Sequence, residues 1–597
     1  MTLQQGHSSE GGNLDANNIE SLITDNMETW TSAIKKKSAT GRGSSKKIEL
    51  YGIKKLRNLI LELAVRGKLV KQNNTDTAVG NLLSSISAER ESLLKQKKIR
   101  KLAKQPSISD KDHPFLIPKT WGFCRFGELT FNRDGERKPV SASDRKSMQG
   151  EYDYYGASGV IDKVNDYLFD KPLLLIGEDG ANLISRSTPI AFIAEGRYWV
   201  NNHAHVIDGA SFDFLSYLAL FINAISLELY ITGTAQPKMN QAKMNSIVVA
   251  VPPVEEQHRI VAKVDELMLL CDQLEQQTES SIDAHKTLVE VLLNTLTDSK
   301  DATELQTNWA RVSEFFDTLF TTEHSIDQLK QTILQLAVMG KLVPQASREA
   351  RNSPNYEPAA KLLERIADEK AQLIADKKIK KQKALPPITE EEKPFELPNG
   401  WEWCRLGDVL QLISDYHANG GYKILKENVD LLDNEDYAIM LRTTNFSKKN
   451  YSSYKYITKS AYNFLDKSRL FAGDIIMNKI GDPGASFFVN DRGRPMSLAM
   501  NLFLLRTQIV NSKYIYLYLK ANYEYIQSFA NGTSTQTITK EAVYNLVLPL
   551  CPINGQEKMI DKADKLLGIC DQLKSRLNNA QQTQLHLADA LVAQAVN

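Results

Sequence analysis

The chain contains the same segments twice, and this repetition restricts the possible fold more than any other feature of the sequence. Residues 53–72 read IKKLRNLILELAVRGKLVKQ, and residues 326–345 read IDQLKQTILQLAVMGKLVPQ. Residues 88–129 then align with residues 368–409 without a gap, including the Pro-Phe, Trp and Cys-Arg landmarks. Generic helix-forming sequence would not share these landmarks, so the matches indicate a duplication.

The order of the repeats differs between the two halves of the chain. A third pair of segments, residues 257–274 and 556–573, ends in Cys-Asp-Gln-Leu in both copies. The middle of the chain carries this third repeat followed by the first and second, whereas the N-terminal part has only the first two and the C-terminal end only the third. Joining the two ends would complete a second copy of the middle. The order therefore predicts a cyclic, pseudo-twofold molecule whose termini meet.

The repeated segments have the pattern of long helices. Residues 255–296 contain no Gly or Pro, and apolar residues follow each other at steps of four and three, as in a coiled-coil seam. The two seams are Ile260, Val264, Leu267, Cys271 and Leu274, and Met559, Ala563, Leu566, Cys570, Leu573 and Leu577. Gly67 and Gly340 are expected to end the helices of the first repeat. Antiparallel pairing of these helices would form two rods. A helix of roughly 25 to 30 residues is about 40 Å long, which is close to the length of one turn of DNA, about 34 Å.

Two unlike segments, residues 120–252 and 400–550, lack this periodicity. They carry short strand-like runs broken by Gly, Asn and Asp, at Pro172–Ile176, Pro189–Ile193, Asp474–Met477 and Leu502–Leu505. Their landmarks align: Ile176–Ala181 with Ile480–Ala485, and Gly233-Thr234 with Gly532-Thr533. These matches predict two copies of one fold with divergent surfaces.

The predicted fold class is therefore α+β, with two globular α/β domains separated by two long antiparallel helical spacers in a circular, pseudo-twofold arrangement. The expected organisation is an N-terminal extension and linker (1–45), repeat helices that pair with the C-terminus (46–119), a first globular domain (120–252), a central helical spacer region (253–399), a second globular domain (400–550) and a C-terminal helix (551–597).

Polar and aromatic residues are dense in the loops of both globular segments. Arg and Lys can pair with guanine, and Asn and Gln with adenine, while other side chains would hold phosphates. The candidate DNA-binding residues are Arg133, Arg137, Lys138, Tyr155, Arg186, Asn202, His203, Gln236, Lys238 and Asn240 in the first segment, and Lys423, Arg442, Asn445, Lys479, Arg492, Arg494, Gln536 and Lys540 in the second. For any one of them, a generic polar loop residue is the alternative interpretation.

Two basic runs follow the second repeated helices. They are Lys95, Lys97, Lys98, Arg100, Lys101 and Lys104, and Lys377, Lys378, Lys380, Lys381 and Lys383. A solvated helix C-terminus explains them, and a contact with phosphates or a partner is the functional alternative.

Composition and motifs exclude several kinds of protein. The formal net charge of +1 is not that of a polycation, and neither an apolar run long enough to span a membrane nor a secretory signal is present, so a cytoplasmic chain is expected. The five cysteines form no Cys-x-x-Cys pair. His203 and His205 could bind a metal with Glu178 or Asp179, but no third ligand has a supporting spacing, so no metal is expected. No P-loop, methyltransferase motif or catalytic triad is recognisable, which favours a chain that is not itself an enzyme.

The sequence resembles the specificity subunits of type I restriction-modification enzymes. The resemblance runs from about residue 19 to the end, and its carriers include YGIKKLRNLILELAVRGKLV from Tyr51, YYGASGVIDKVNDYLFD from Tyr154, LLIGEDGANLISRSTPIAFIAEGRYWVNNHAH from Leu174, GTAQPKMNQAKMNSIVVAVPP from Gly233 and PFELPNGWEW from Pro394. The N-terminal extension, with Gly-Arg-Gly-Ser-Ser at residues 41–45, is most similar to the type IB group.

The resemblance implies that the unlike segments are target recognition domains. Each would read one half of a bipartite, asymmetric site in double-stranded DNA. The helical repeats would set the unread spacer and dock two modification subunits, which form an adenine-N6 methyltransferase, and two restriction subunits, which add an ATP-dependent nuclease. S-adenosylmethionine, ATP and Mg would bind to those partners and none to this chain. Gln236 and Pro237 match the family's loop, whereas the second segment lacks the Pro at this place and shifts the Gln to Gln536.

Two other interpretations remain open at this point. One is a coiled-coil scaffold whose globular domains bind proteins instead of DNA. The other is a self-contained restriction or methylation enzyme with an active site that the motifs do not reveal. A purified chain that modified DNA without partners would support the enzyme, and a chain without DNA sequence preference would support the scaffold.

Overall fold

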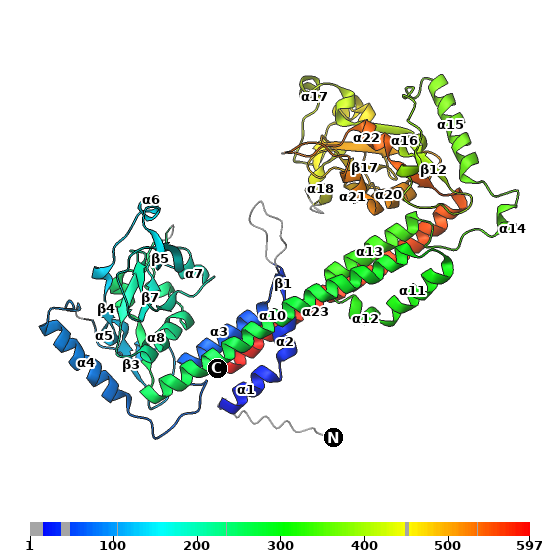
Figure 1. Ribbon diagram of the computed structural model, residues 1–597. Helices are drawn as coiled ribbons and strands as arrows, with labels where there is room; N and C mark the ends of the chain where they lie inside the picture. Colours follow the sequence, from blue (N-terminus) through cyan, green and yellow to red (C-terminus); the bar gives the residue numbers. More distant parts are fainter. Residues whose placement is uncertain are drawn as a thin grey trace, which may run out of the picture. The chain divides into compact units, whose positions relative to one another are not determined.

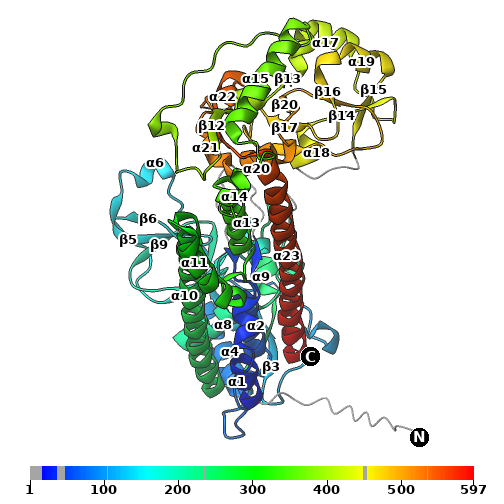
Figure 2. The same ribbon diagram turned by 90° about the vertical axis from the view of Figure 1, so that its right-hand side faces the viewer.

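The computed structural model divides the chain into two compact units. It describes residues 16–36, 48–103, 105–233, 236–447, 453–533 and 535–596. Unit 1 comprises Met1–Ile282 together with Asn579–Asn597, and unit 2 comprises Asp283–Asn578. Most of the predicted extension, Lys104 of the first basic run, and Thr234 lie outside the described residues. The C-terminal end of the last helix lies within unit 1 in both views (Figures 1 and 2), which confirms that the two ends of the chain meet.

Three helices from distant parts of the sequence pack together in unit 1. They are α3 (Tyr51–Val65), the first part of α10 (Val254–Asp298) and the end of α23 (Ile553–Val596). Tyr51 Oη donates to Asp589 Oδ1 at 2.8 Å and Lys68 Nζ donates to the Val596 carbonyl at 3.0 Å, so α3 and the end of α23 run parallel.

Helix α3 runs antiparallel to α10. Arg57, in the middle of α3, pairs with Asp272 at 2.7 Å, whereas Gln72, beyond its end, donates to Glu256 near the start of α10. The end of α23 is therefore antiparallel to α10 within this unit.

Unit 2 repeats this arrangement with the roles of the two long helices exchanged. Helix α13 (Glu323–Val338) occupies the place of α3. Lys330, the repeat equivalent of Arg57, pairs with Asp571 of α23 at 2.5 Å. Lys341 Nζ donates to the carbonyl of Thr297, near the end of α10, at 2.7 Å. The repeated sequence therefore makes the same contacts twice, as the pseudo-twofold prediction requires.

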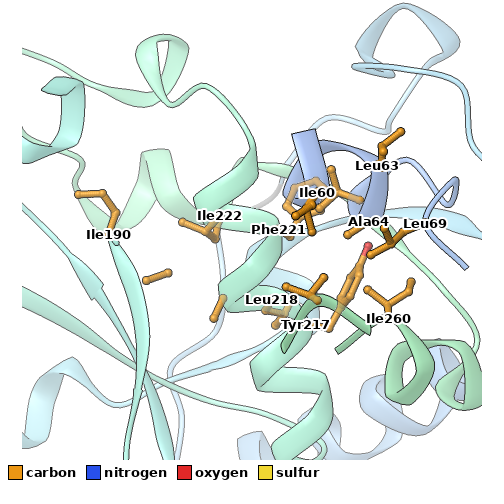
Figure 3. Close-up of a cluster of buried hydrophobic side chains, with 14 of the residues drawn as sticks. Ile60, Leu63, Ala64, Leu69, Ile190, Tyr217, Leu218, Phe221, Ile222 and Ile260 are labelled. Carbon is orange, nitrogen blue, oxygen red and sulfur yellow. The ribbon is translucent and has the colours of Figure 1, made fainter. Parts of the chain in front are cut away.

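The apolar stripes predicted from the sequence are the seams of these helices. Ile260, Val264, Leu267, Cys271 and Leu274 of α10 are all buried, and they join one cluster with α3 and with Ala588, Leu591 and Ala595 of α23. Figure 3 shows Ile60, Leu63 and Ala64 of α3 packed near Tyr217, Leu218 and Phe221 of a helix from the globular part. This continuous cluster buries the helical part and the globular domain against each other.

Gly67 and Gly340 end α3 and α13 in the left-handed conformation, with φ of 68° and 72°, as predicted. Gly52 is needed for another reason. A Cβ atom at this position would lie 2.3 Å from the Trp30 carbonyl oxygen. The helix α2 (Met27–Ser32) of the N-terminal extension therefore packs directly on the backbone of α3.

Domain 1 of unit 1 contains the strands and helices between residues 122 and 251. The remaining elements of unit 1 are α1 (Ala16–Thr24), β1 (Lys35–Lys36), β2 (Ile48–Glu49), α4 (Val79–Lys95), β3 (Gly122–Arg125), α5 (Phe126–Leu129), β4 (Phe131–Asn132), α6 (Ala142–Arg145), β5 (Gln149–Gly156), β6 (Gly159–Val164), β7 (Leu173–Gly177), α7 (Asn182–Ser185), β8 (Ala191–Ala194), β9 (Tyr198–Val200), β10 (Ala204–Asp208), α8 (Phe212–Ala224), α9 (Gln241–Asn245) and β11 (Val248–Val251).

Domain 2 of unit 2 contains the strands and helices between residues 402 and 550. The remaining elements of unit 2 are α11 (Ala302–Glu314), α12 (Phe316–Leu319), α14 (Arg348–Arg351), α15 (Ala359–Ala375), β12 (Glu402–Arg405), α16 (Leu406–Val409), β13 (Leu412–Asp415), α17 (Tyr422–Asn428), β14 (Ala438–Leu441), α18 (Thr443–Ser447), β15 (Lys455–Ile457), α19 (Lys459–Phe464), β16 (Arg469–Leu470), β17 (Ile475–Asn478), β18 (Ser486–Phe488), β19 (Met496–Leu498), β20 (Leu502–Arg506), α20 (Ser512–Ala521), α21 (Tyr523–Gln527), α22 (Lys540–Asn545) and β21 (Val547–Leu550).

The two domains share their strand topology, except that the second sheet of domain 2 has one additional strand, β16. Each has a four-stranded antiparallel sheet, in the order β4-β10-β7-β8 in domain 1 and β13-β20-β17-β18 in domain 2. Each also has a second sheet with one parallel pair, β5 with β9 and β14 with β19. A third pair, β3 with β11 and β12 with β21, closes each domain at its ends. The sequence prediction of one fold in two copies is confirmed.

Candidate nucleic-acid interface

Three loops of domain 1 meet at the end of its four-stranded sheet. The backbone N–H of Glu178, after β7, donates to the His203 carbonyl at 2.8 Å. The Met239 N–H donates to the Glu178 carbonyl at 2.8 Å, and the Gly180 N–H donates to the Pro237 carbonyl at 3.0 Å. Backbone hydrogen bonds thus hold the three loops together while their side chains are free to differ. We call this arrangement the three-loop frame.

Domain 2 has the same three-loop frame. The Lys479 N–H donates to the Asn501 carbonyl at 2.9 Å, the Ile538 N–H donates to the Lys479 carbonyl at 3.0 Å, and the Gly481 N–H donates to the Gln536 carbonyl at 3.0 Å. Lys479 therefore stands where domain 1 has Glu178. The same frame position therefore carries opposite charges in the two domains on an unchanged backbone.

This equivalence corrects one alignment made from sequence. The match of Ile176–Ala181 with Ile480–Ala485 is wrong by three residues, because the hydrogen bonds place Gly180 opposite Gly481. The similar Gly-Ala letters in domain 2 belong to a turn that follows the frame. The match of Gly233 with Gly532 is correct, since both have positive φ and each directly follows the first residue of an equivalent bridging pair, Thr232 with Lys238 and Asn531 with Thr537.

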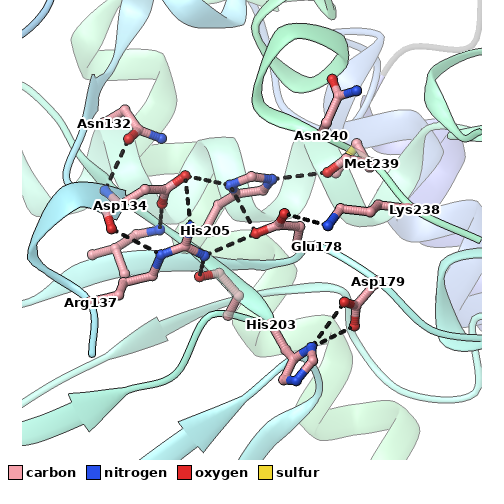
Figure 4. A network of polar contacts seen from close by, with 12 residues as sticks. Asn132, Asp134, Arg137, Glu178, Asp179, His203, His205, Lys238, Met239 and Asn240 are labelled. Carbon is pink, nitrogen blue, oxygen red and sulfur yellow. Dashed lines mark hydrogen bonds and ion pairs between the residues drawn. The ribbon is translucent and has the colours of Figure 1, made fainter. Parts of the chain in front are cut away.

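A network of charged side chains lies beneath the three-loop frame of domain 1 (Figure 4). His205 on β10 is 1% exposed, and its Nδ1 lies 2.7 Å from Asp134 Oδ2 while its Nε2 lies 2.9 Å from the Met239 carbonyl oxygen. Arg137 donates to Glu178 at 3.0 Å and Lys238 pairs with Glu178 at 3.2 Å. The network ties all three loops to the sheet.

The carboxylates of this network are held in their charged form. Burial alone would raise the pKa of Asp134, but the hydrogen bond from His205 and that from the Val206 N–H bring it below its ordinary value. Burial likewise opposes ionisation of Glu178, whereas His205, Arg137 and Lys238 together lower the pKa of Glu178. The site beneath the loops is therefore a balanced set of charges.

In domain 2 a smaller set of charges takes this place. Asp415, at the end of β13, is paired with Lys479 at 3.6 Å and with Lys540 at 3.3 Å. Both lysines were predicted from sequence, and the structure brings them together on one carboxylate. Asp134 and Asp415 were missed, and their only signal in the sequence is a position at or just after the end of the first strand of each four-stranded sheet.

Three predicted arginines of domain 1 make contacts inside the protein. Arg133 pairs with Glu136 and with Asp208, and Arg137 donates to Glu178 and to the Ala204 carbonyl. Arg186 donates to the Ile222 and Ile225 carbonyls at the end of α8, and burial lowers its pKa. These guanidinium groups therefore hold the fold together through Glu136, Asp208, Glu178 and the carbonyls at the end of α8.

The other predicted residues of domain 1 lie nearer to solvent. Lys138, Asn202, His203, Gln236, Lys238 and Asn240 are exposed. His203 pairs with Asp179 at 2.9 Å, and the Asn240 side chain accepts from the Lys243 N–H at the start of α9. Tyr155 is half-buried between Phe192 and Tyr198. Asn202, Gln236 and Lys238 lie on the loops of the frame.

The predicted residues of domain 2 are divided between the frame and two other places. Lys479, Gln536 and Lys540 lie at the frame, and Gln536 is exposed. Arg442 donates to the Ser453 carbonyl, and Asn445, 1% exposed, accepts from the Arg442 N–H. Arg494 pairs with Glu435 at 2.6 Å. Lys423 is exposed on α17, and Arg492 is half-exposed on the loop before β19.

The His-x-His pair does not converge. His203 turns to Asp179 and His205 turns to Asp134, as Figure 4 shows. Among the described residues, no group of three or more His, Cys, Asp or Glu side chains could hold a metal ion. In the same part of the chain no helix is both long and apolar enough to cross a membrane.

A known family accounts for these paired domains. The family described as "Type I restriction modification DNA specificity domain" matches residues 118–284 and residues 398–581, one match for each unlike segment with part of the helix that follows it. The chain belongs to the specificity subunits of type I restriction-modification enzymes.

Specificity subunits of known enzymes match nearly the whole chain. The EcoAI specificity subunit of Escherichia coli is 38% identical, and the EcoEI specificity subunit of the same species is 40% identical. Each alignment covers 97% of this chain and 100% of the relative. Among solved structures, the HsdS subunit from Thermoanaerobacter tengcongensis is 16% identical with a TM-score of 0.39, covering 81% of this chain and 98% of that chain.

Proposed function

We propose that this chain gives a type I restriction-modification complex its DNA sequence specificity. Domain 1 and domain 2 each read one half of a bipartite, asymmetric site in double-stranded DNA. The chain is not catalytic by itself. Two modification subunits supply adenine-N6 methylation with S-adenosylmethionine, and two restriction subunits supply the nuclease with ATP and Mg, so the bases read here decide where both reactions occur.

The observation that carries this proposal is the repeated three-loop frame with unlike side chains. A reader of two different half-sites needs one backbone that presents different donors and acceptors in each copy. Glu178 and Lys479 occupy the same frame position with opposite charge, and Thr535 stands where domain 1 has Gln236. A scaffold for proteins has no need to keep the frame and change only its side chains.

Exposed side chains of the frame are the ones we assign to base reading. Gln236 and Gln536 can pair with adenine through two hydrogen bonds, and Lys238 can donate to the N7 and O6 atoms of guanine. The buried charges below hold the backbone of these loops in place, so Arg137 and His205 are assigned a positioning role. A rigid support is what base discrimination requires, because a loop that adapts to a wrong base loses selectivity.

Helices α10 and α23 are assigned the spacer and docking roles. They contain 45 and 44 residues, and at about 1.5 Å per residue each is long enough to set the unread gap between half-sites. Insertion of one helical turn into α10 after Ile282 and into α23 after Asn578, where each helix passes from one unit into the other, is expected to change this gap. An unchanged gap would refute the spacer role.

A domain exchange tests the proposal. Residues 120–252 are replaced by the corresponding segment of another specificity subunit, and methylated adenines are mapped in cells that contain the modification subunits. One half of the recognised site is expected to change while the other half stays. The matched control exchanges residues 400–550 and is expected to change the opposite half. Change in both halves, or in neither, would contradict the proposal, and methylation without sequence preference would favour the scaffold.

A further inference from the structure

Two equivalent turns outside the recognition domains each carry four exposed basic residues. The turn of unit 1 follows α4 and contains Lys97, Lys98, Arg100 and Lys101. The turn of unit 2 follows α15 and contains Lys377, Lys378, Lys380 and Lys381. All eight side chains are exposed. No acidic residue occurs between residues 92 and 109 or between residues 377 and 389.

Both turns have a backbone conformation that costs stability for lysine. Lys97 and Lys377 each have a φ of 58°, and they are two of only four non-glycine residues with left-handed φ in the described part of the chain. The Lys98 N–H donates to the Leu93 carbonyl and the Lys97 N–H to the Leu94 carbonyl, at 2.9 and 3.0 Å. This is the Schellman motif, whose left-handed position is normally glycine because a Cβ atom is strained there.

Glycine closes the same turn at two other helix ends, where a Cβ atom at Gly67 would also lie 2.5 Å from Pro118 and one at Gly340 2.7 Å from Pro398. Helices α3 and α13 end in the same motif, with Gly67 and Gly340 at the left-handed position and the Lys68 and Lys341 N–H groups closing the outer bond. Lysine at the ends of α4 and α15 is therefore not required by the turn. Retaining it in both copies, against the conformational cost, indicates that the side chain has a use.

The turns hold their charges toward solvent. Ile99 between the basic residues packs on the large core cluster of unit 1, and Ile379 is half-buried at the same place in unit 2. Among the described contacts Lys97, Lys98, Arg100 and Lys101 have no acidic partner, whereas Lys378 pairs with Asp376 at 3.2 Å. In each turn, an anchored apolar residue with exposed cations on both sides fits a ligand with a row of negative charges.

We propose that each turn binds the phosphates of the DNA backbone, without reading sequence, beside the domain of its own unit. This inference rests on the proposed function, because a DNA reader brings a polyanion to both units. Phosphate contacts fix the register of a protein on the duplex and carry no base information. The turns would thus add affinity equally at every sequence, while the three-loop frames supply the selectivity.

Salt dependence of DNA binding by the full chain tests this inference. Variants replace the four basic residues of one turn, or of both, by Gln, and the control replaces Lys286, Lys300, Lys562 and Lys565, which are exposed elsewhere. Binding to a mixed-sequence duplex is measured from low to moderate salt. The slope of log K against log salt is expected to fall by about 0.9 for each phosphate that the variant no longer neutralises, with little change in the control and none in the sequence preference.

Two single changes give a second readout. Lys97→Gly and Lys377→Gly are expected to raise the thermal unfolding midpoint, because glycine relieves the left-handed strain, and at the same time to lower the affinity for the duplex. A gain in stability with unchanged DNA affinity would overturn the inference. An unchanged salt slope in the Gln variants would also overturn the inference. This holds even if those variants lose binding to a protein partner. A wild-type chain that binds no DNA would overturn the proposed function as well.

Discussion

The Lys68 ammonium group lies 3.0 Å from the carbonyl oxygen of Val596, 528 residues further along the chain. Lys341 makes the corresponding contacts with the carbonyls of Thr297 and Ser299, at 2.7 and 2.8 Å. The lysine of each Gly-Lys-Leu-Val motif thus satisfies carbonyl groups at a helix C-terminus, where backbone acceptors lack helical partners. Lys341 caps the end of α10, which lies shortly before it in the sequence, whereas Lys68 caps the end of α23, the last helix of the chain.

Loss of the Lys68 hydrogen bond is expected to destabilise unit 1. Lys68→Met keeps the apolar stem and removes the donor, and should lower the free energy of unfolding by about 1–2 kcal/mol. Chemical denaturation of the full chain measures the change. Lys54→Met is the matched control, because Lys54 is 58% exposed and, within the described part of the chain, pairs with Glu49 at the surface; its effect should be about 0–0.5 kcal/mol. Equal losses of unfolding free energy in both variants would contradict a specific stabilising role of the Lys68 hydrogen bond.

Lys370 is expected to make the free energy of unfolding depend on pH. Arg90, its equivalent in unit 1, cannot have this effect because arginine stays charged. Lys370 donates to the Gly407 carbonyl at 2.7 Å, and burial lowers its pKa to about 8. The unfolded chain binds this proton up to a higher pH than the folded chain does, so stability is expected to rise between pH 8 and about 10.5.

Substitution isolates this contribution. Lys370→Arg, which copies Arg90 of α4, is expected to remove it because arginine stays charged throughout. Unfolding midpoints between pH 7 and 11 provide the measurement. A rise of the same size in the Arg variant would show that Lys370 is not its source.

His205 is expected to matter for one half-site only. Both of its ring nitrogens face oxygen acceptors, Asp134 and the Met239 carbonyl. His205→Leu would remove the donor to the Met239 carbonyl and one donor to Asp134, which keeps the Val206 N–H, at a cost of about 1–3 kcal/mol, and would loosen the loop that carries Lys238. Discrimination at the half-site of domain 1 should weaken while that of domain 2 is retained.

The measurement for His205 compares methylation of duplexes altered in one half-site or the other. His258→Leu serves as the control for loss of an imidazole, since His258 is 56% exposed and pairs with Asp213 outside the frame. Equal loss at both half-sites would mean that His205 supports the whole chain and not the loops of domain 1.

The helical part of the fold was predictable because its signals are local and repeated. The glycines at the ends of α3 and α13 and the stripe from Ile260 to Leu274 follow from spacing alone, and the repeat order predicted that the chain ends meet. The frame register was not predictable, since the residues around Glu178 and Lys479 share no sequence. The partners of Arg186 were equally hidden, because the carbonyls at the end of α8 become acceptors only when the chain has folded.

Duplication of one recognition domain tests the central claim most directly. Residues 120–252 are replaced by a second copy of residues 400–550, and methylated adenines are mapped across DNA from cells that contain this variant and the modification subunits. Because the two units repeat one arrangement, we predict methylation at inverted repeats of the half-site that domain 2 reads. Methylation that stays at the original asymmetric sites, in a variant that still folds and assembles, would contradict the assignment of one half-site to each domain.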